Sequence, residues 1–287
     1  MNDELLDETR RSWNLATEAH NRHKRDQAGF LRAGGSTLFP EETELVGELR
    51  GQRLLHLLCN SGQDTLSLAG LGARVTGVDL SDEAIRFATT LAADAGIAAS
   101  FIVSEAQAFL DAAEPASFDV VFMSYGGLIW IADIDRLFRG ISRVLAPGGR
   151  FVTLDFHPLV WSFADDLRSL KEPYFAPGHV YSDPVSDYVG ASGAALAPSG
   201  LATPPDDGPT FTNPHSAHSY QHTVADQLTA MIAAGLTITT VREYPHANGC
   251  RVNASLVERE GRRFTTPDGT PNLPLMFGAV ATRHSGM

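Results

Sequence analysis

The residues best suited to chemistry lie between Leu54 and Ser81. There a short apolar run leads through the turn Cys59-Asn60-Ser61-Gly62 into a helical stretch and a second apolar run that ends in Asp79. In a sheet of parallel strands joined by helices, ligands bind at the carboxyl ends of the strands. An acidic residue that ends the second strand can accept hydrogen bonds from a ribose diol. The segment therefore predicts a ligand that contains adenosine.

The composition of the turn narrows the choice of ligand. The Gly-x-Gly-x-x-Gly spacing that lets a backbone approach a pyrophosphate is absent, and Gly62 is the one glycine of the turn. A ligand without phosphates tolerates the side chains of Asn60 and Ser61, and Asn60 can donate to a carboxylate. S-adenosylmethionine is such a ligand. The sequence contains no Walker motif, Gly-x-Ser-x-Gly elbow or Cys-x-x-Cys pair.

The elements that position this turn are short apolar runs alternating with helical stretches. We expect strands at Arg53–Leu58, Arg74–Asp79, Ser100–Val103, Asp119–Ser124 and Arg150–Phe156, and helices at Asp64–Gly70, Asp82–Ala95 and Ile134–Leu145. Strands that are apolar on both faces and alternate with helices predict a parallel, doubly wound α/β sheet covered on both sides. Pro147-Gly148-Gly149 predicts a turn before the last of these strands.

The flanking segments have a different character. Helices are expected at Asp7–Lys24 and Glu41–Leu49. Residues 173–214 hold eight of the sixteen prolines and little periodicity, which fits either a linker or a lid. A helix at Val224–Ala234 and strands at Thr237–Tyr244 and Leu275–Thr282 then return to the sheet. We therefore divide the chain into a helical flap (1–50), a ligand-binding core (51–157), a lid or acceptor-binding insertion (158–222) and a return to the core (223–287).

Charge and composition exclude several classes of protein. The chain has 287 residues and a formal charge of −12, which argues against a nucleic-acid partner because such binding depends on neutralising phosphates. No window approaches the roughly 20 apolar residues of a membrane span. Two distant cysteines, Cys59 and Cys250, and an acidic start without an apolar run predict a reduced, cytoplasmic protein.

The motif at residues 56–66, HLLCNSGQDTL, resembles one branch of the class I S-adenosylmethionine-dependent methyltransferases, whose first motif reads His-Leu-x-Cys-x-x-Gly-x-Asp-Thr-Leu. The commoner motif of that superfamily has an acid at the position of His56 and glycines at those of Leu58 and Asn60. Residues 75–85, 118–134, 145–159, 219–238 and 273–281 also resemble the branch. The resemblance implies a Rossmann-like sheet of seven strands with the last strand antiparallel, N-terminal helices and a lid insertion.

The resemblance also implies roles for individual residues. Asp79 would bind the ribose, Leu80 would pack on the adenine, and Ser81 would cap the following helix. Glu105 and the backbone of Ala106 would contact the adenine edge. The full set expected to bind S-adenosylmethionine, with S-adenosylhomocysteine as the product, is His56, Cys59, Asn60, Ser61, Gly62, Asp64, Asp79, Leu80, Ser81, Glu105, Ala106, Ser124 and Tyr125.

Methyl transfer to a phenol, amine or indole carbon requires a group that removes a proton. His157 is the first candidate because it directly follows the fifth strand, and Tyr125 and His222 come next. His20 and His23 could reach the site from the N-terminal flap, but histidines on a charged helix are more often solvated. The spacing His215-x-x-His218-x-x-x-His222 is compatible with zinc, yet no metal is expected because the reaction needs none.

The acceptor is expected to be a small, aromatic metabolite, since aromatic residues are frequent in the segments that would enclose it. The working hypothesis is O-, N- or indole C-methylation in natural-product biosynthesis, a secondary-metabolism role taken from the family. Three alternatives remain open: a non-catalytic S-adenosylmethionine-binding protein, an NAD-dependent oxidoreductase on the same fold, and a protein methyltransferase with an open groove. The apolar last strand could also pair across a homo-oligomer.

Overall fold

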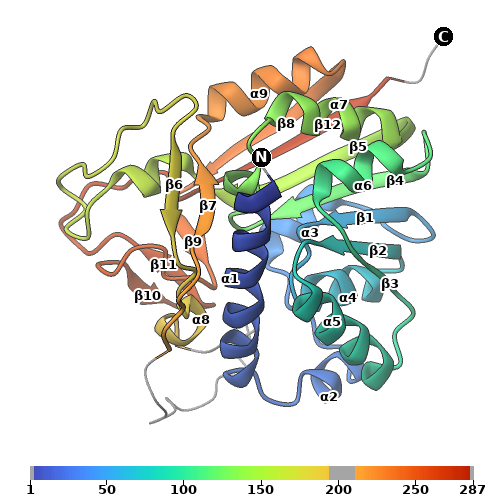
Figure 1. The fold of residues 1–287 in the computed structure, drawn as a ribbon, viewed down its shortest axis with the longest axis horizontal. Coiled ribbons are helices and arrows are strands. Elements are labelled where there is room, and N and C mark those ends of the chain that lie inside the picture. Colours follow the sequence, from blue (N-terminus) through green and yellow to red (C-terminus); the bar gives the residue numbers. More distant parts are fainter. Residues whose placement is uncertain (1–2, 194–210, 285–287) are drawn as a thin grey trace.

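The computed structural model describes residues 3–193 and 211–284 and is built on a seven-stranded sheet (Figure 1). Its strand order is β3-β2-β1-β4-β5-β12-β8, with bounds β1 Arg53–Leu57, β2 Arg74–Asp79, β3 Ser100–Val103, β4 Phe118–Ser124, β5 Leu145–Phe156, β8 Leu236–Tyr244 and β12 Met276–Arg283. Neighbouring strands from β3 to β5 are parallel, whereas β12 runs antiparallel to both β5 and β8. The predicted doubly wound sheet with an antiparallel last strand is confirmed.

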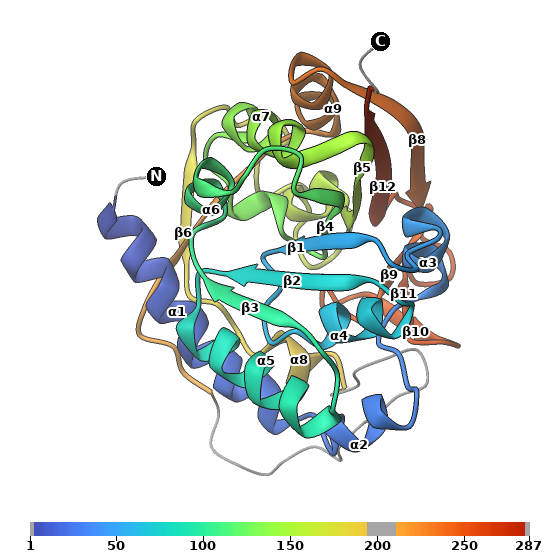
Figure 2. The same cartoon turned by 90° about the vertical axis from the view of Figure 1, so that its right-hand side faces the viewer.

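Helices cover both faces of this sheet (Figure 2). On one face lie α6 Ala106–Ala112, α7 Ile134–Val144 and α9 Val224–Ala233; on the other lie α3 Pro40–Val46, α4 Gln63–Gly70 and α5 Asp82–Ala95. Leu54 and Leu55 of β1 are both fully buried but belong to the cores of opposite faces. Two-sided burial explains why the strands are continuous apolar runs rather than alternating ones.

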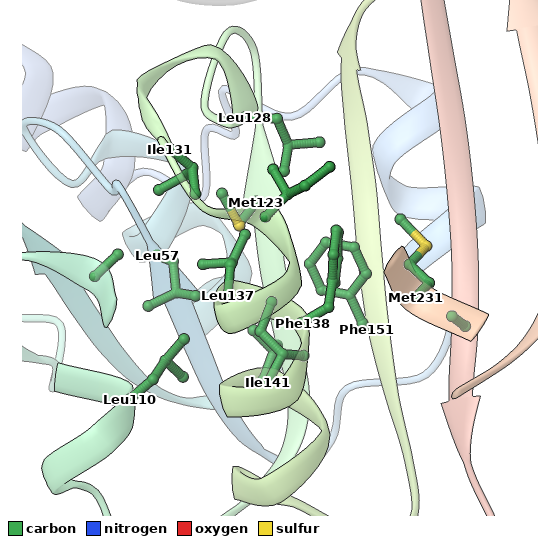
Figure 3. Packing of buried hydrophobic residues seen from close by; sticks show 14 of the residues in the cluster. Leu57, Leu110, Met123, Leu128, Ile131, Leu137, Phe138, Ile141, Phe151 and Met231 are labelled. Atoms are coloured by element: carbon green, nitrogen blue, oxygen red, sulfur yellow. The ribbon is translucent and has the colours of Figure 1, made fainter. Parts of the chain in front are cut away.

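The core beneath α7 shows how closely the layers fit (Figure 3). Phe138 of α7 stands edge-on to Phe151 of β5, with ring centroids 5.3 Å apart. Leu137 and Ile141 of the same helix are fully buried beside them. This packing holds the long strands β4 and β5 at fixed positions, so the loops at their carboxyl ends start from a rigid base.

The turn expected at Pro147-Gly148-Gly149 is part of β5. Strand β4 pairs Phe118 with Leu145 and then Val120 with Arg150, so the extra residues form a bulge in β5. Gly148 has a φ of 78°, the left-handed conformation that such a bulge requires. The predicted turn before a strand that starts at Arg150 is therefore wrong: β5 already begins at Leu145, and β4 pairs with it on both sides of the bulge.

Several elements were not expected from the sequence. They are α2 Gln27–Arg32, α8 Tyr188–Ala191, the short helices η1 Leu128–Trp130 and η2 Pro158–Ser162, the antiparallel strand pair β6 Val180–Asp183 and β7 Ala217–Tyr220, and a small sheet of β9 His246–Asn248, β11 Arg263–Thr265 and β10 Val257–Arg259. The pair β6–β7 is called the hairpin below, although a long segment connects its strands. The hairpin lies beside α1 Asp3–Arg22 (Figure 1). Part of the expected linker or lid, residues 194–210, lies outside the described residues.

None of the helices in the described part of the chain is both long enough and apolar enough to span a membrane.

Candidate active site

A cavity of about 840 Å³ opens at the carboxyl ends of β1, β2 and β4. This is the volume range of small-molecule sites, about 300–1,000 Å³. Helix α1 contributes Trp13 and His20 to its wall, and the β6–β7 hairpin contributes Tyr181 and Ser219. The cavity thus lies between the sheet edge, the N-terminal helix and the hairpin.

Asp79 ends β2 and faces this cavity. Its Oδ2 accepts the Asn60 backbone N–H at 2.7 Å, and its Oδ1 accepts the Ser81 backbone N–H at 2.8 Å. Burial raises the pKa of the carboxyl, and these two amide donors oppose that rise. The amides hold the carboxylate in one orientation while lone pairs remain for a ligand hydroxyl group.

The turn after β1 is held in an uncommon backbone conformation. Leu58, Asn60 and Gly62 have φ values of 54°, 47° and 77°. The first two are the positions at which the commoner superfamily motif has glycine, so the left-handed geometry persists here with other residues. The Asn60 side chain accepts the Ser61 backbone N–H at 2.7 Å, which helps an asparagine to occupy this region.

Gly62 supports the turn by close packing rather than by contact with the cavity. A Cβ at this position would lie 2.7 Å from the Ala88 Cβ of α5 and 2.8 Å from the Phe101 ring of β3. Glycine is therefore required where the start of α4 meets α5 and β3.

Two predicted ligand residues are helix caps. Ser81 begins α5, and its Oγ accepts the Ala84 N–H at 3.0 Å, as the resemblance implied. Glu105 begins α6, and its two carboxylate oxygens accept the N–H groups of Gln107 and Ala108 at 3.0 and 2.7 Å. Glu105 lines the cavity and Ser81 does not.

Most residues predicted to bind the methyl donor meet at this cavity. Those that line it are His56, Cys59, Asn60, Asp64, Asp79, Leu80, Glu105, Ala106, Ser124 and Tyr125. Ser61, Gly62 and Ser81 lie behind this lining. His56 is buried, its Nδ1 lies 2.8 Å from the Thr65 Oγ1, and burial lowers its pKa to about 3, so it is a neutral side chain.

A pair of opposite charges that the sequence did not single out lines the same cavity. Lys24 follows α1, and burial lowers its pKa to about 8, an effect that Asp64 of α4 opposes. Burial raises the pKa of Asp64, whose carboxylate accepts a hydrogen bond from the Thr37 hydroxyl. A half-buried lysine and a half-buried aspartate that line one cavity can receive the two charges of an amino acid.

Tyr125 lies directly after β4 with a φ of 45°. Its hydroxyl donates to the Glu42 Oε2 at 2.8 Å and accepts from the Asn248 Nδ2 at 3.3 Å. Burial and the nearby Glu42 charge raise the pKa of this phenol well above its usual value, so the hydroxyl stays protonated.

The structure places the other two candidates for proton removal outside the cavity lining. The His157 Nε2 lies 3.1 Å from the Glu243 Oε1, and its Nδ1 accepts the Leu159 N–H at the start of η2. The His222 Nε2 lies 2.7 Å from the Ile131 carbonyl oxygen, to which it must donate. Both imidazoles connect chain segments, since each is bonded to a residue distant in the sequence.

His20, by contrast, is buried in the cavity wall, although its sequence context indicated a solvated side chain. It is 1% exposed, and burial lowers its pKa to about 4. Its Nε2 donates to the Ser186 carbonyl at 2.9 Å, and its ring lies 4.2 Å from that of Tyr188. Trp13 stands edge-on to Trp130, 5.4 Å away. This aromatic wall forms only when the hairpin and α8 pack against α1, so it could not be predicted from the sequence.

The described residues contain no group of histidine, cysteine and acidic side chains that could hold a metal. Within the candidate zinc spacing, His218 bonds to Glu8 and Ser182, whereas His222 bonds to Ile131. These two side chains therefore do not share a centre.

Part of the chain is similar to a known protein family. Residues 54–149 match a family described as a methyltransferase domain. A ubiquinone biosynthesis O-methyltransferase from Burkholderia vietnamiensis is 41% identical over 129 residues, 45% of this chain and 50% of that protein. The chain spans about half the length of the first curated relatives it matches.

Solved structures extend the likeness to most of the chain. An S-adenosylmethionine-dependent methyltransferase from Mesorhizobium loti has a TM-score of 0.54 at 22% identity and covers 85% of this chain and 96% of its own. A geranyl diphosphate C-methyltransferase from Streptomyces coelicolor has a TM-score of 0.51 at 17% identity, with 85% and 77% covered. Residues 54–149 are therefore similar to a methyltransferase domain, and the sheet has the fold of these S-adenosylmethionine-dependent methyltransferases.

Proposed function

We propose that the protein transfers a methyl group from S-adenosylmethionine to a small aromatic acceptor. The observation that carries this proposal is the Asp79 carboxylate, which ends β2, is oriented by the Asn60 amide and faces the same cavity as Glu105 and Tyr125. Acidic groups at the ends of the second and third strands suit the ribose hydroxyls and the adenine amine of the donor.

The chemistry of the lining fits the remainder of the donor. Leu58, Val78 and Leu80 provide apolar contacts near Asp79, as an adenine ring requires. Lys24 and Asp64 match the carboxylate and the ammonium of an amino acid. A pyrophosphate would instead need close approach of the backbone at Leu58 and Asn60, where side chains stand. This argues against NAD.

The protein's task in such a reaction is alignment and exclusion of water. When bound, S-adenosylmethionine supplies an activated methyl group on a sulfonium ion. The side chains of α1 and the β6–β7 hairpin would enclose the acceptor above Tyr125, so the reacting atoms meet in line without competing water. We propose that these two elements form the flap and the lid expected from the sequence.

The wall opposite the sheet favours an aromatic acceptor. Trp13, Trp130 and Tyr188 are large, flat side chains that can stack against a ring. Several curated relatives are named ubiquinone biosynthesis O-methyltransferase, which favours a hydroxyl acceptor over an amine or an indole carbon. A role in natural-product biosynthesis is part of this proposal.

Calorimetric titration with S-adenosylmethionine, S-adenosylhomocysteine and NAD tests the donor site. Asp79→Asn keeps the shape of the side chain but removes its charge, and we expect it to weaken binding of the first two ligands by at least about tenfold. Asp82→Asn is the matched control, because Asp82 lies three residues further along, outside the cavity, where it bonds to Arg10 and Asn14. Binding of NAD in place of both adenosyl ligands would overturn the proposal.

Formation of S-adenosylhomocysteine with a panel of phenols, indoles and amines then tests catalysis. Turnover with phenols supports the acceptor class. Donor binding without turnover on any member of the panel would favour a non-catalytic binding protein instead.

A further inference from the structure

Glu42 is a buried acid that the proposed binding of donor and acceptor does not use. It is the third residue of α3 and has no exposed surface. Its Oε2 accepts the Phe39 backbone N–H at 2.8 Å and the Tyr125 hydroxyl at 2.8 Å. Its Oε1 is buried and has no hydrogen-bond partner among the described residues.

No basic side chain of the described residues compensates this acid. The nearby basic side chains His246 and Arg263 both pair with the neighbouring Glu41. The ionisable groups that act on Glu42 are Asp64 of α4, Tyr125 and Glu41 itself. Burial, and then the Asp64 charge, raise the pKa of Glu42 well above its ordinary value, so the carboxylate is a stronger base than an exposed glutamate.

A helix cap by itself does not require a titrating group here. A glutamine could accept the same two hydrogen bonds through its carbonyl oxygen without the cost of burying an acid. The Glu42 carboxylate instead accepts a hydrogen bond from Tyr125, which has a strained backbone conformation and lines the cavity. Strained residues at the end of a strand are concentrated at functional sites. The two side chains thus form a line from the cavity into the protein.

We propose that Tyr125 and Glu42 form a proton relay that ionises a hydroxyl acceptor. The acceptor gives its proton to the Tyr125 oxygen while the Tyr125 proton moves to the Glu42 Oε2. Asn248, which donates to the Tyr125 oxygen, holds the ring in place. Tyr125 is the residue that touches the acceptor, and Glu42 acts through it.

The relay rests on the proposed function and accounts for the proton that the acceptor loses during methyl transfer. A phenol and the Glu42 carboxylate become a phenolate and a neutral carboxyl group. The phenolate oxygen forms the new O–CH₃ bond while the S–CH₃ bond breaks and leaves its electron pair on sulfur. The proton on Glu42 later returns to solvent, so the reaction needs no oxidant, metal or further reactant.

A chromogenic phenol tests the relay without turnover. The probe is 4-nitrophenol, whose phenolate absorbs at longer wavelength, bound to the wild-type protein with sinefungin, a donor analogue that carries an amine in place of the methylsulfonium. In the wild type the proton of the probe passes through Tyr125 to Glu42 and stays within the complex. We therefore expect the fraction of bound probe that is phenolate to stay constant over about one pH unit near neutrality. In Glu42→Gln and Tyr125→Phe the bound probe should titrate with pH.

The ionisation of the bound probe distinguishes the relay from a direct exchange of protons with solvent. A bound probe that titrates with pH in the wild type, or a pH-independent fraction that persists in Glu42→Gln, would overturn the relay. Failure of 4-nitrophenol to bind beside sinefungin would also overturn it for phenols. Failure of sinefungin itself to bind in the calorimeter would instead contradict the proposed donor site, so the two failures are distinguishable.

Stability measurements separate the relay from a structural role. Because the pKa of Glu42 is raised in the folded protein, the stability that protonated Glu42 contributes is present at acid pH. It is lost as the pH rises through the folded-state pKa of Glu42. Glu42→Gln should therefore be as stable as the wild type at acid pH and more stable at alkaline pH. A variant that is less stable throughout would assign Glu42 to capping alone. Glu42→Asp, which keeps a carboxylate, should restore part of the pH-independent ionisation.

Discussion

At the scale of single residues, the site depends on backbone conformations that few residue types adopt. The turn after β1 carries three positive φ values within five residues, and Tyr125 after β4 carries another. Each non-glycine residue in this region costs about 1 kcal/mol or more, which the surrounding packing must offset. In this conformation the Asn60 amide of the turn donates to Asp79.

Gly62→Ala tests how tightly this turn is packed. The new Cβ would be only 2.7 Å from Ala88 and would also require a strained φ of 77°. We expect a loss of about 2–4 kcal/mol in the free energy of unfolding, measured by urea denaturation.

Gly96→Ala is the control for backbone strain alone. Gly96 has a φ of 70°, but a Cβ added there would meet no heavy atom within 4 Å, so only about 1 kcal/mol should be lost. Equal losses for the two variants would show that packing around Gly62 contributes nothing.

At the scale of elements, the enclosure of the cavity depends on the attachment of the β6–β7 hairpin to α1. Asn213 is buried between them, and its Nδ2 donates to the Ser12 backbone oxygen at 3.0 Å and to the Val185 oxygen at 3.1 Å. The Val185 N–H in turn donates to the Ser12 Oγ at 3.1 Å. A few buried polar contacts thus fix the position of the aromatic wall.

Asn213→Ala should loosen the hairpin without unfolding the sheet. Removing the amide leaves two buried carbonyl groups without this donor, at a cost of about 1–3 kcal/mol. Hydrogen exchange followed by mass spectrometry should show faster exchange in β6 and β7 and unchanged exchange in β4 and β5.

Ser219→Ala provides the comparison within the hairpin, because this hydroxyl makes no hydrogen bond to the described residues. It should leave exchange unchanged. Faster exchange throughout the sheet in Asn213→Ala would contradict a local role for the asparagine.

At the scale of the whole molecule, buried ionisable groups make stability depend on pH. His56 and His20 are neutral in the folded protein, with pKa values lowered by burial to about 3 and about 4 from an ordinary 6.5. The unfolded chain binds protons that the folded chain does not. Stability from these neutral side chains is therefore complete above pH 6.5 and is lost as pH falls toward their folded values.

His56→Gln should reduce this acid sensitivity. One histidine that titrates only in the unfolded state contributes a slope of about 1.4 kcal/mol per pH unit. Urea unfolding between about pH 4.5 and pH 7 should give a smaller slope for the variant by up to this amount. Parallel curves for the two proteins would mean that His56 is protonated in the folded state or does not affect acid stability.

The amino-acid sequence was enough to define the sheet, the turn after β1 and the acid that ends β2. These features are local. Continuous apolar runs, which can be buried on both faces, define the strands, and the turn joins β1 to α4, the helix that leads back to the adjacent strand β2. The bounds of β2, β3 and α5 agree with those predicted. Asp79 and Asn60 are 19 residues apart, yet the parallel pairing of β1 with β2 brings them together.

Only the folded chain reveals which side chains face the cavity from outside the sheet. His20 and Glu42 come from the first 50 residues, and their burial arises only when α1 docks against α8 and β7 and α3 docks against Tyr125 after β4. Lys24 lines the cavity from just after α1 and is half-buried. His157 has a favourable place in the sequence, but its ring turns to Glu243. Local patterns report on neighbours along the chain, whereas burial and ionisation depend on contacts between distant segments.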